Sequence, residues 1–373
     1  MLSGLDGECT ESRCVGCGGG CGRWFYWPVI INGFLEEIGE EFFFFFTLHL
    51  PDAGVLEKGF SMSENQKSDS NLLVPSTRRN LFKGMATGLV ASSMAGPAIV
   101  SGAKKGKKAG VRKGRINQSV VSWCFAKHWS VEETCKHAKN LGCKSVELID
   151  SKHWPVLKKH GLTCAISGIP VDGPPFIKGY NNPEYHGWLI KATKQAIDES
   201  ADFGCPNVIA FTGYEENFSR EQGAKNCIEG FKKVAGYAEK KGVTICLEML
   251  NSRDDTDPNK GHPGYQGDHT DYCMDILNAV GSPRVKLLFD IYHVQIMDGD
   301  VIRRIGECGD MIGHVHTAGN PGRGELDDKQ EINYPPIMKA LLDIKYKAFV
   351  GQEFIPTRDP VKGLTEAVEL CDV

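Results

Sequence analysis

From residue 116 onward, short apolar runs alternate with longer amphipathic ones. The short runs predict β-strands over 118–123, 144–149, 162–167, 207–211, 243–248, 285–290, 312–317 and 348–353. Between several of them, apolar residues recur at the i, i+3, i+4 and i+7 spacing of an amphipathic helix. This spacing predicts helices over 131–141, 183–203, 220–240, 269–280, 333–344 and 360–371. Gly204 and Gly242 each stand between a predicted helix and the next strand, where glycine commonly ends a helix.

The alternation of eight strands with helices predicts a closed (β/α)8 TIM barrel over residues 116–373. These 258 residues match the size of such a barrel, which is about 250 residues. The alternative is an open, doubly wound sheet. The sequence disfavours it because no GxGxxG segment follows the first strand and no phosphate-binding P-loop is present.

Ionisable residues recur where the predicted strands end, which is where TIM barrels place their catalytic groups. Glu248, Asp290, His316 and Glu353 end four consecutive strands. Three carboxylates in one closed barrel mouth would repel each other unless they bound a cation. The set therefore predicts a divalent metal site, best suited to Mn²⁺ or Mg²⁺, with Zn²⁺ or Co²⁺ as alternatives. The competing interpretation is that these residues cap helices or pair with Lys and Arg.

Five segments carry a resemblance to a known family. They are CLEMLN (246–251), FDIYHVQIMDGD (289–300), GHVHTAGNPGRGELDD (313–328), EINYPPIMKAL (331–341) and GQEFIP (351–356). With these segments, residues 116–373 resemble the hydroxypyruvate isomerase family within the xylose-isomerase-like barrel superfamily of sugar isomerases and epimerases. The resemblance covers nearly the whole predicted barrel and is strongest over its second half.

The resemblance implies roles for individual residues. Glu248 and Glu353 match the carboxylates that transfer the proton, and these two together with Asp290 and His316 match the metal ligands. Three further residues match positions near the substrate, namely His293, Arg323 and Glu325. The implied reaction interconverts hydroxypyruvate and tartronate semialdehyde through an enediolate, on a small hydroxy-carbonyl substrate.

Two departures from the family pattern leave other functions open. His316 stands where hydroxypyruvate isomerases resemble HVQ, with Gln, and His is closer to the ketose 3-epimerases. Gly324-Glu325-Leu326 replaces an expected HEP. The alternatives are thus a ketose 3-epimerase, or a sugar-binding barrel without catalysis. An abasic-site endonuclease of the same barrel type would need more His ligands, and the net charge of −7 over 116–373 disfavours DNA and other nucleic acids as partners.

Residues 1–115 have a different character. Residues 1–61 hold four early cysteines and the run Phe42–Phe46, and we expect an unstructured leader before a true start at Met62. Residues 62–103 resemble a twin-arginine export signal, with Arg78-Arg79 ahead of a weakly apolar run. The implied location is periplasmic, with the cytoplasm as the alternative.

Residues 104–115 carry seven basic residues and no acidic one, and we expect a flexible linker. No stretch of 18 residues is continuously apolar, so we expect no stable membrane insertion. The ten cysteines after residue 116 are scattered singly, which is typical of a protein without a disulfide framework. A homo-oligomer is left open.

Overall fold

The structure is a computed structural model that describes residues 31–38, 41–50, 54–62 and 112–373. It divides into two units, Met1–Ser101 and Gly102–Val373. In the second unit, seven parallel strands form one sheet in the order β5-β4-β10-β9-β8-β7-β6. The strands are β4 (Asn117–Val121), β5 (Ser145–Glu147), β6 (Asn207–Ala210), β7 (Thr244–Glu248), β8 (Val285–Asp290), β9 (Ile312–Thr317) and β10 (Phe349–Gln352).

Residues 162–167 close this sheet into a barrel. Thr163 bridges to Ser145 of β5, and Ser167 bridges to Val208 of β6, both in parallel orientation. The segment thus occupies the place of the predicted strand 162–167, although it holds its neighbours by isolated bridges instead of a full ladder. The fold is therefore the predicted TIM barrel.

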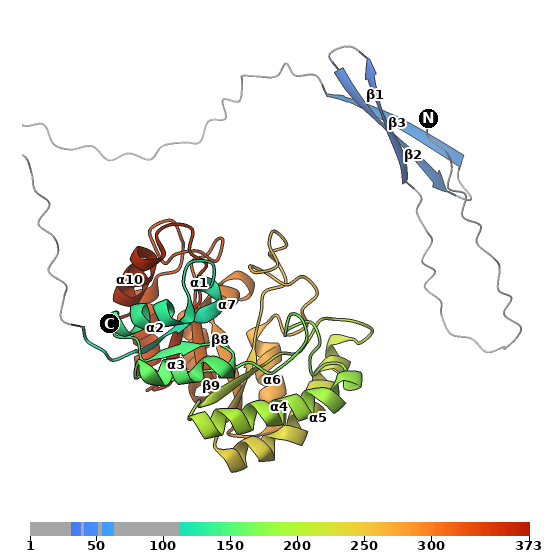
Figure 1. The fold of residues 1–373 in the computed structure, drawn as a ribbon. Helices are drawn as coiled ribbons and strands as arrows, with labels where there is room; N and C mark the ends of the chain where they lie inside the picture. Colours follow the sequence, from blue (N-terminus) through green and yellow to red (C-terminus); the bar gives the residue numbers. More distant parts are fainter. Residues whose placement is uncertain (1–30, 39–40, 51–53, 63–111) are drawn as a thin grey trace, which may run out of the picture. The chain divides into compact units, whose positions relative to one another are not determined.

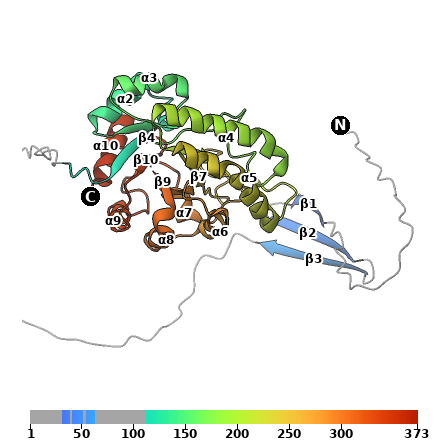
Figure 2. The same ribbon diagram turned by 90° about the horizontal axis from the view of Figure 1, so that it is seen from below.

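Helices surround the strands (Figure 1). They are α1 (Ser122–Phe125), α2 (Val131–Asn140), α3 (Trp154–Lys159), α4 (Pro183–Phe203), α5 (Arg220–Lys241), α6 (Thr270–Val280), α7 (Ile291–Met297), α8 (Val301–Cys308), α9 (Tyr334–Asp343) and α10 (Pro360–Leu370). Two short 3-10 helices, η1 (Ser151–His153) and η2 (Gly309–Met311), complete the unit. The view from below shows β4, β10, β9 and β7 in the centre, with the helices around them (Figure 2).

Local sequence signals explain where several helices begin and end. Ser130 and Glu133 form a capping box at the start of α2, in which each side chain binds the other residue's backbone N–H. Gly204 and Gly242 end α4 and α5 in the left-handed conformation, with φ of 88° and 72°. Glycine adopts this conformation without the steric cost that a Cβ atom imposes. These are two of the helix ends that the sequence predicted.

The core fills the space between the strands and the surrounding helices. Residues such as Val120, Ile245 and Leu287 of the strands and Phe231 of α5 are fully buried. All ten cysteines of the barrel are buried and free in the described part of the chain. Among the described residues, no helix combines the length and apolar character needed to cross a bilayer.

The other unit contains an antiparallel sheet in the order β1-β2-β3. Its strands are β1 (Ile31–Ile38), β2 (Glu41–Leu50) and β3 (Gly54–Met62). The run Phe42–Phe46 pairs with both neighbours as part of β2, where an unstructured leader was expected. Whether this segment belongs to the mature protein stays a prediction.

The export signal over 62–103 lies, apart from Met62, outside the described residues, as do the four early cysteines and residues 104–111 of the linker. The linker's last residues contact the chain end. Lys113 and Gly114 donate backbone hydrogen bonds of 2.7 Å to the Asp372 carboxylate, and the Nε atom of the Arg115 side chain donates one to the Val373 carbonyl. This part of the linker is therefore bound to the barrel.

Candidate active site

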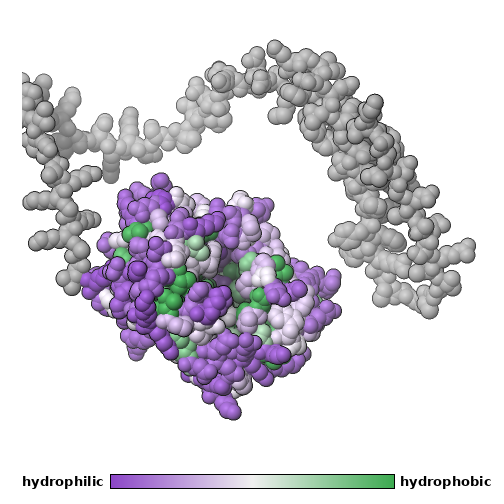
Figure 3. Space-filling model, in the orientation of Figure 1, coloured by the Kyte–Doolittle hydropathy of each residue, from purple (hydrophilic) through white to green (hydrophobic). Residues whose placement is uncertain are grey.

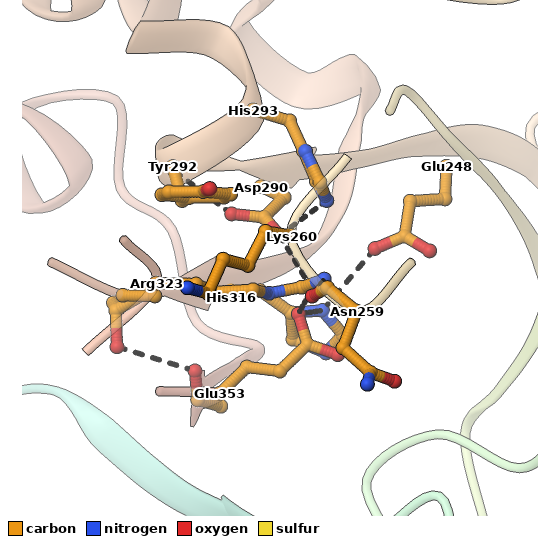
Figure 4. A network of polar contacts seen from close by, with 12 residues as sticks. Glu248, Asn259, Lys260, Asp290, Tyr292, His293, His316, Arg323 and Glu353 are labelled. Carbon is orange, nitrogen blue, oxygen red and sulfur yellow. Dashed lines mark hydrogen bonds and ion pairs between the residues drawn. The ribbon is translucent and has the colours of Figure 1, made fainter. Parts of the chain in front are cut away.

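The structure brings the four predicted metal ligands together at the C-terminal end of the barrel. Glu248 and Asp290 end β7 and β8, His316 lies in β9, and Glu353 directly follows β10. Each residue offers one ligand atom, and these atoms all lie within 4.8 Å of one another in a buried cluster. They converge because the carboxyl ends of parallel strands meet at one mouth. Figure 4 shows the four side chains turned toward one point.

His316 connects this cluster to the carboxylate of Glu147, which is not one of the four predicted ligands. Its Nδ1 atom lies 3.0 Å from Glu353 Oε2 and 3.4 Å from Glu248 Oε1. Its other ring nitrogen, Nε2, lies 2.9 Å from Glu147 Oε1. The Glu147 carboxylate can only accept when ionised, so Nε2 is the donor and Nδ1 is left to face the cluster.

Glu147 holds a second histidine as well. His314 Nε2 donates to the same Oε1 atom of Glu147 at 2.8 Å. Burial alone would raise the pKa of Glu147, but His314 and His316 outweigh it and lower the pKa to about 2. Gly351 of β10 makes room for this contact, since a Cβ atom there would stand 2.2 Å from Glu147 Oε1. Glu147 thus fixes the ring of His316 from beneath.

The carboxylates of the cluster repel one another. Burial, followed by the charge of Glu353, raises the pKa of Asp290 to about 8. Burial also raises the pKa of Glu248. Burial opposes ionisation of Glu353 too, but His316 and Arg323 outweigh it and hold its pKa well below its usual range. The cluster therefore favours the binding of a cation, which reduces this repulsion.

The donor atoms fit a divalent cation. Glu248 Oε1 and His316 Nδ1 are buried and have no hydrogen-bond partner, although buried polar atoms are normally paired. Three carboxylates and one imidazole make an oxygen-rich set that suits Mn²⁺ or Mg²⁺ and accepts other divalent metals. Glu248, Asp290, His316 and Glu353 are thus the residues that could hold the metal.

Arg323 lies beside the cluster, in the loop after β9. Its Nη2 atom is 2.6 Å from Glu353 Oε2 and 3.5 Å from Asp290 Oδ2. The guanidinium group stacks between Trp123 and Tyr292, each ring centroid 5.5 Å away. Its Nε atom is buried without a hydrogen-bond partner. Arg323 therefore brings a buried, partly unpaired guanidinium group to the site.

His293 also lies at the cluster, as the third residue of α7. Its Nδ1 atom accepts hydrogen bonds from the backbone N–H and the side chain of Asn251, at 3.1 and 2.7 Å. The proton therefore lies on Nε2, which is 3.5 Å from Asp290 Oδ2 and has no hydrogen-bond partner. Burial, reinforced by Arg323, lowers the pKa of His293 well below its usual value. His293 is a neutral donor that faces the cluster.

The structure places Glu325 elsewhere. Its carboxylate accepts hydrogen bonds from the backbone N–H groups of Thr357 and Arg358 and from the Thr357 hydroxyl, at 2.7 to 3.2 Å. It does not line the cavity described next. The loop after β10 thus occupies both carboxylate oxygens, and the expected contact of Glu325 with substrate stays a prediction.

A cavity of about 640 Å³ opens onto the cluster. Glu248, Glu353 and Arg323 line one part of it. The remaining walls include Trp123 and residues that follow β5, the closing segment 162–167 and β6. The cluster is therefore accessible to a small molecule from the barrel mouth.

The predicted ligands and substrate-binding residues include neither Glu147 nor His314. His314 and His316 are two positions apart in β9, so both point to the inside of the barrel. The spacing of the two histidines predicts their common direction. It does not predict that both contact Glu147 on β5, which is 167 positions from His314 along the chain.

Comparison with known proteins decides the family. The family model of the xylose isomerase-like TIM barrel matches residues 135–372. The chain belongs to this family. The match includes all four ligands, Glu147 and Arg323, so the cluster lies within the family's own barrel.

Two related proteins indicate the class of reaction. A human protein named as a candidate hydroxypyruvate isomerase is 34% identical over 262 residues, which cover 66% of this chain and 91% of that protein. The hydroxypyruvate isomerase of Escherichia coli strain K12 is 31% identical over 147 residues, 39% of this chain and 54% of that enzyme. This xylose isomerase-like barrel is an isomerase.

Solved structures agree on the fold. A crystal structure of a family 2 AP endonuclease from Brucella melitensis has a TM-score of 0.57 and 26% identity. It covers 67% of this chain and 97% of its own. The uncovered third of this chain is close to the share that precedes the barrel.

Proposed function

We propose that this isomerase interconverts hydroxypyruvate and tartronate semialdehyde, using a divalent metal and two glutamates. The observation that carries the proposal is the placement of Glu248 and Glu353. They come from β7 and β10, which are not neighbours in the sheet, yet both approach His316 Nδ1, at 3.4 and 3.0 Å. A substrate held at this point would have both carboxylates within reach.

The reaction moves one proton between adjacent carbons. One glutamate removes a proton from the carbon that bears the terminal hydroxyl, which leaves an enediolate. A proton is then delivered to the former carbonyl carbon, so that the ketone becomes an alcohol and the alcohol becomes an aldehyde. A bound divalent metal would supply Lewis-acid polarisation of the carbonyl, held by Glu248, Asp290, His316 and Glu353. Positioned acid–base groups contribute roughly 10²–10⁴-fold in rate.

In this proposal, one cationic donor and one neutral donor orient the substrate. Arg323 presents its guanidinium beside Glu353, and its planar fork suits the carboxylate of hydroxypyruvate. The Nε2–H of His293 lacks a partner and can donate to a substrate oxygen. Trp123 and Tyr292 limit the movement of the Arg323 side chain, so the carboxylate would be bound in one orientation.

The test is hydrogen exchange into substrate. The metal-loaded protein is incubated with hydroxypyruvate in heavy water, and deuterium at carbon is followed by NMR together with product formation. We expect Glu248→Gln and Glu353→Gln to lower both signals by at least 100-fold. Asp268→Asn is the control, because Asp268 is a buried carboxylate paired with Arg220 at 2.9 Å, outside the cluster. Retained exchange in both glutamine variants would refute the proposal.

The ketose 3-epimerase alternative draws its support from His316, which completes the four-residue ligand set. In that reaction the second glutamate returns the proton to the opposite face of the same carbon. A panel that compares hydroxypyruvate with D-fructose separates the two. Nicking of abasic DNA, tested on the same preparation, addresses the activity named for the Brucella structure.

A further inference from the structure

The cavity at the barrel mouth is much larger than the substrate proposed above requires. Its volume of about 640 Å³ lies within the range of roughly 300–1,000 Å³ that is typical of pockets for drug-sized ligands. Hydroxypyruvate is a three-carbon acid and needs only the part beside Glu248, Glu353 and Arg323. The rest of the volume has no occupant in that reaction.

The two parts of the cavity differ in chemistry. The metal-ligand cluster belongs to β7, β8, β9 and the end of β10. The other part is lined by apolar residues from the opposite half of the barrel, among them Ile149 after β5, Ile169 after the closing segment, and Phe211 after β6. The space-filling view shows a hollow in the surface with apolar residues beside it (Figure 3).

Three ring side chains lie next to one another in the cavity wall. The Phe176 ring lies 4.2 Å from the His262 ring and 6.2 Å from the Phe211 ring, measured between centroids. All three residues line the cavity. Flat side chains in such a position provide a surface on which a ring can stack.

The cavity also has a polar border on α4. Gln195 and Glu199 both line it, and the Gln195 amide donates a hydrogen bond of 3.0 Å to the Glu199 carboxylate. Gln195 is exposed and Glu199 half-buried, so both retain free hydrogen-bonding capacity. The cavity thus offers reacting groups in one part, apolar walls in another, and polar groups on the helix that borders them.

We infer that the apolar part is a subsite for a ring attached to the reacting hydroxy-carbonyl unit, so that the same site also accepts a sugar extended by another sugar. A sugar ring has apolar C–H faces and a polar edge of hydroxyl groups. Its faces suit Ile169, Phe176 and Phe211, and its hydroxyls suit Gln195 and Glu199. The inference rests on the proposed function, because the same two glutamates move the proton.

The test compares three probes in the exchange assay described above: hydroxypyruvate, D-fructose, and lactulose, in which galactose is joined to fructose. We expect kcat/KM for exchange into lactulose to exceed that for D-fructose at least tenfold, since even small apolar groups in a pocket change kcat/KM by roughly tenfold or more. Ile169→Trp fills the subsite and should remove this advantage, while exchange into hydroxypyruvate stays within twofold.

Ile302→Trp is the matched control, because Ile302 is 49% exposed on α8 and does not line the cavity. It should change none of the three rates. Gln195→Ala provides a second variant, at an exposed position where folding is not at risk, and should lower kcat/KM for lactulose about fivefold.

Equal exchange into lactulose and D-fructose in the unmodified protein would overturn the inference. So would an Ile169→Trp variant that folds and affects all probes equally. Failure of the proposed function has a different signature, because exchange would then survive both Glu248→Gln and Glu353→Gln with every probe.

Discussion

We expect Glu147 to raise the affinity of the site for a metal although it is not one of the four predicted ligands. Its Oε1 atom receives two hydrogen bonds, from His314 at 2.8 Å and from His316 at 2.9 Å. Glu147→Gln keeps the shape and an acceptor oxygen but removes the charge. A hydrogen bond to a charged group contributes about 1.5–3 kcal/mol, against about 0.5–1.5 kcal/mol for a neutral one.

Only the bond to His316 bears directly on the ligand set, so the expected loss is about 1–1.5 kcal/mol. This corresponds to roughly tenfold weaker metal binding. The value agrees with the roughly 10–100-fold cost of removing the residues that orient metal ligands. The assay is calorimetric titration of the metal-free protein with Mn²⁺, with thermal unfolding of the metal-free form as a check on folding.

Asp268→Asn again serves as the control, since it alters a buried carboxylate that lies outside the cluster. Its Mn²⁺ affinity should equal that of the unmodified protein. The reasoning is refuted if Glu147→Gln folds and binds Mn²⁺ as tightly as the unmodified protein. It is also refuted if both variants lose affinity equally, because the effect would then be a general loss of packing.

Three further predictions follow from described contacts. Gly351→Ala places a Cβ atom 2.2 Å from Glu147 Oε1, so urea unfolding should show a loss of about 1–3 kcal/mol, and an unchanged midpoint would contradict the tight fit. Arg323→Lys keeps the charge but loses the fork, so KM for hydroxypyruvate should rise about tenfold in steady-state assays; an equal KM would exclude a bidentate contact. Ser130→Ala removes the capping box with Glu133 and should cost about 0.5–2 kcal/mol in thermal unfolding, with metal affinity unaltered.

The sequence was sufficient for the barrel because its signals are local. Glycine at helix ends and apolar runs of strand length depend on near neighbours along the chain, and they located β7, β8 and α4 closely. The segment 162–167 was less regular than predicted, because its neighbours β5 and β6 hold it by single bridges, and pairing partners are not encoded in the segment itself.

Some residues of the site could be predicted from the sequence and others could not. Glu248 and Asp290 could be predicted because they end strands, and every strand end of a parallel barrel reaches the same mouth. Glu147 and His314 could not be recognised as a pair, since their contact depends on tertiary packing and on the missing side chain of Gly351. The hydrogen bonds of Glu325 to the loop after β10 could not be predicted, because a motif gives a residue's position in the chain but not the direction of its side chain.

The buried cysteines of the barrel determine how it tolerates oxidants. A thiol reacts as its thiolate, and burial raises the pKa of Cys143 and Cys371 to about 12, far above neutral pH. Such thiols are both shielded from reagents and held in their unreactive form. Cys143 and Cys371 therefore stay in the thiol form at neutral pH, and we expect both to react slowly with oxidants even without a reducing agent in the solvent.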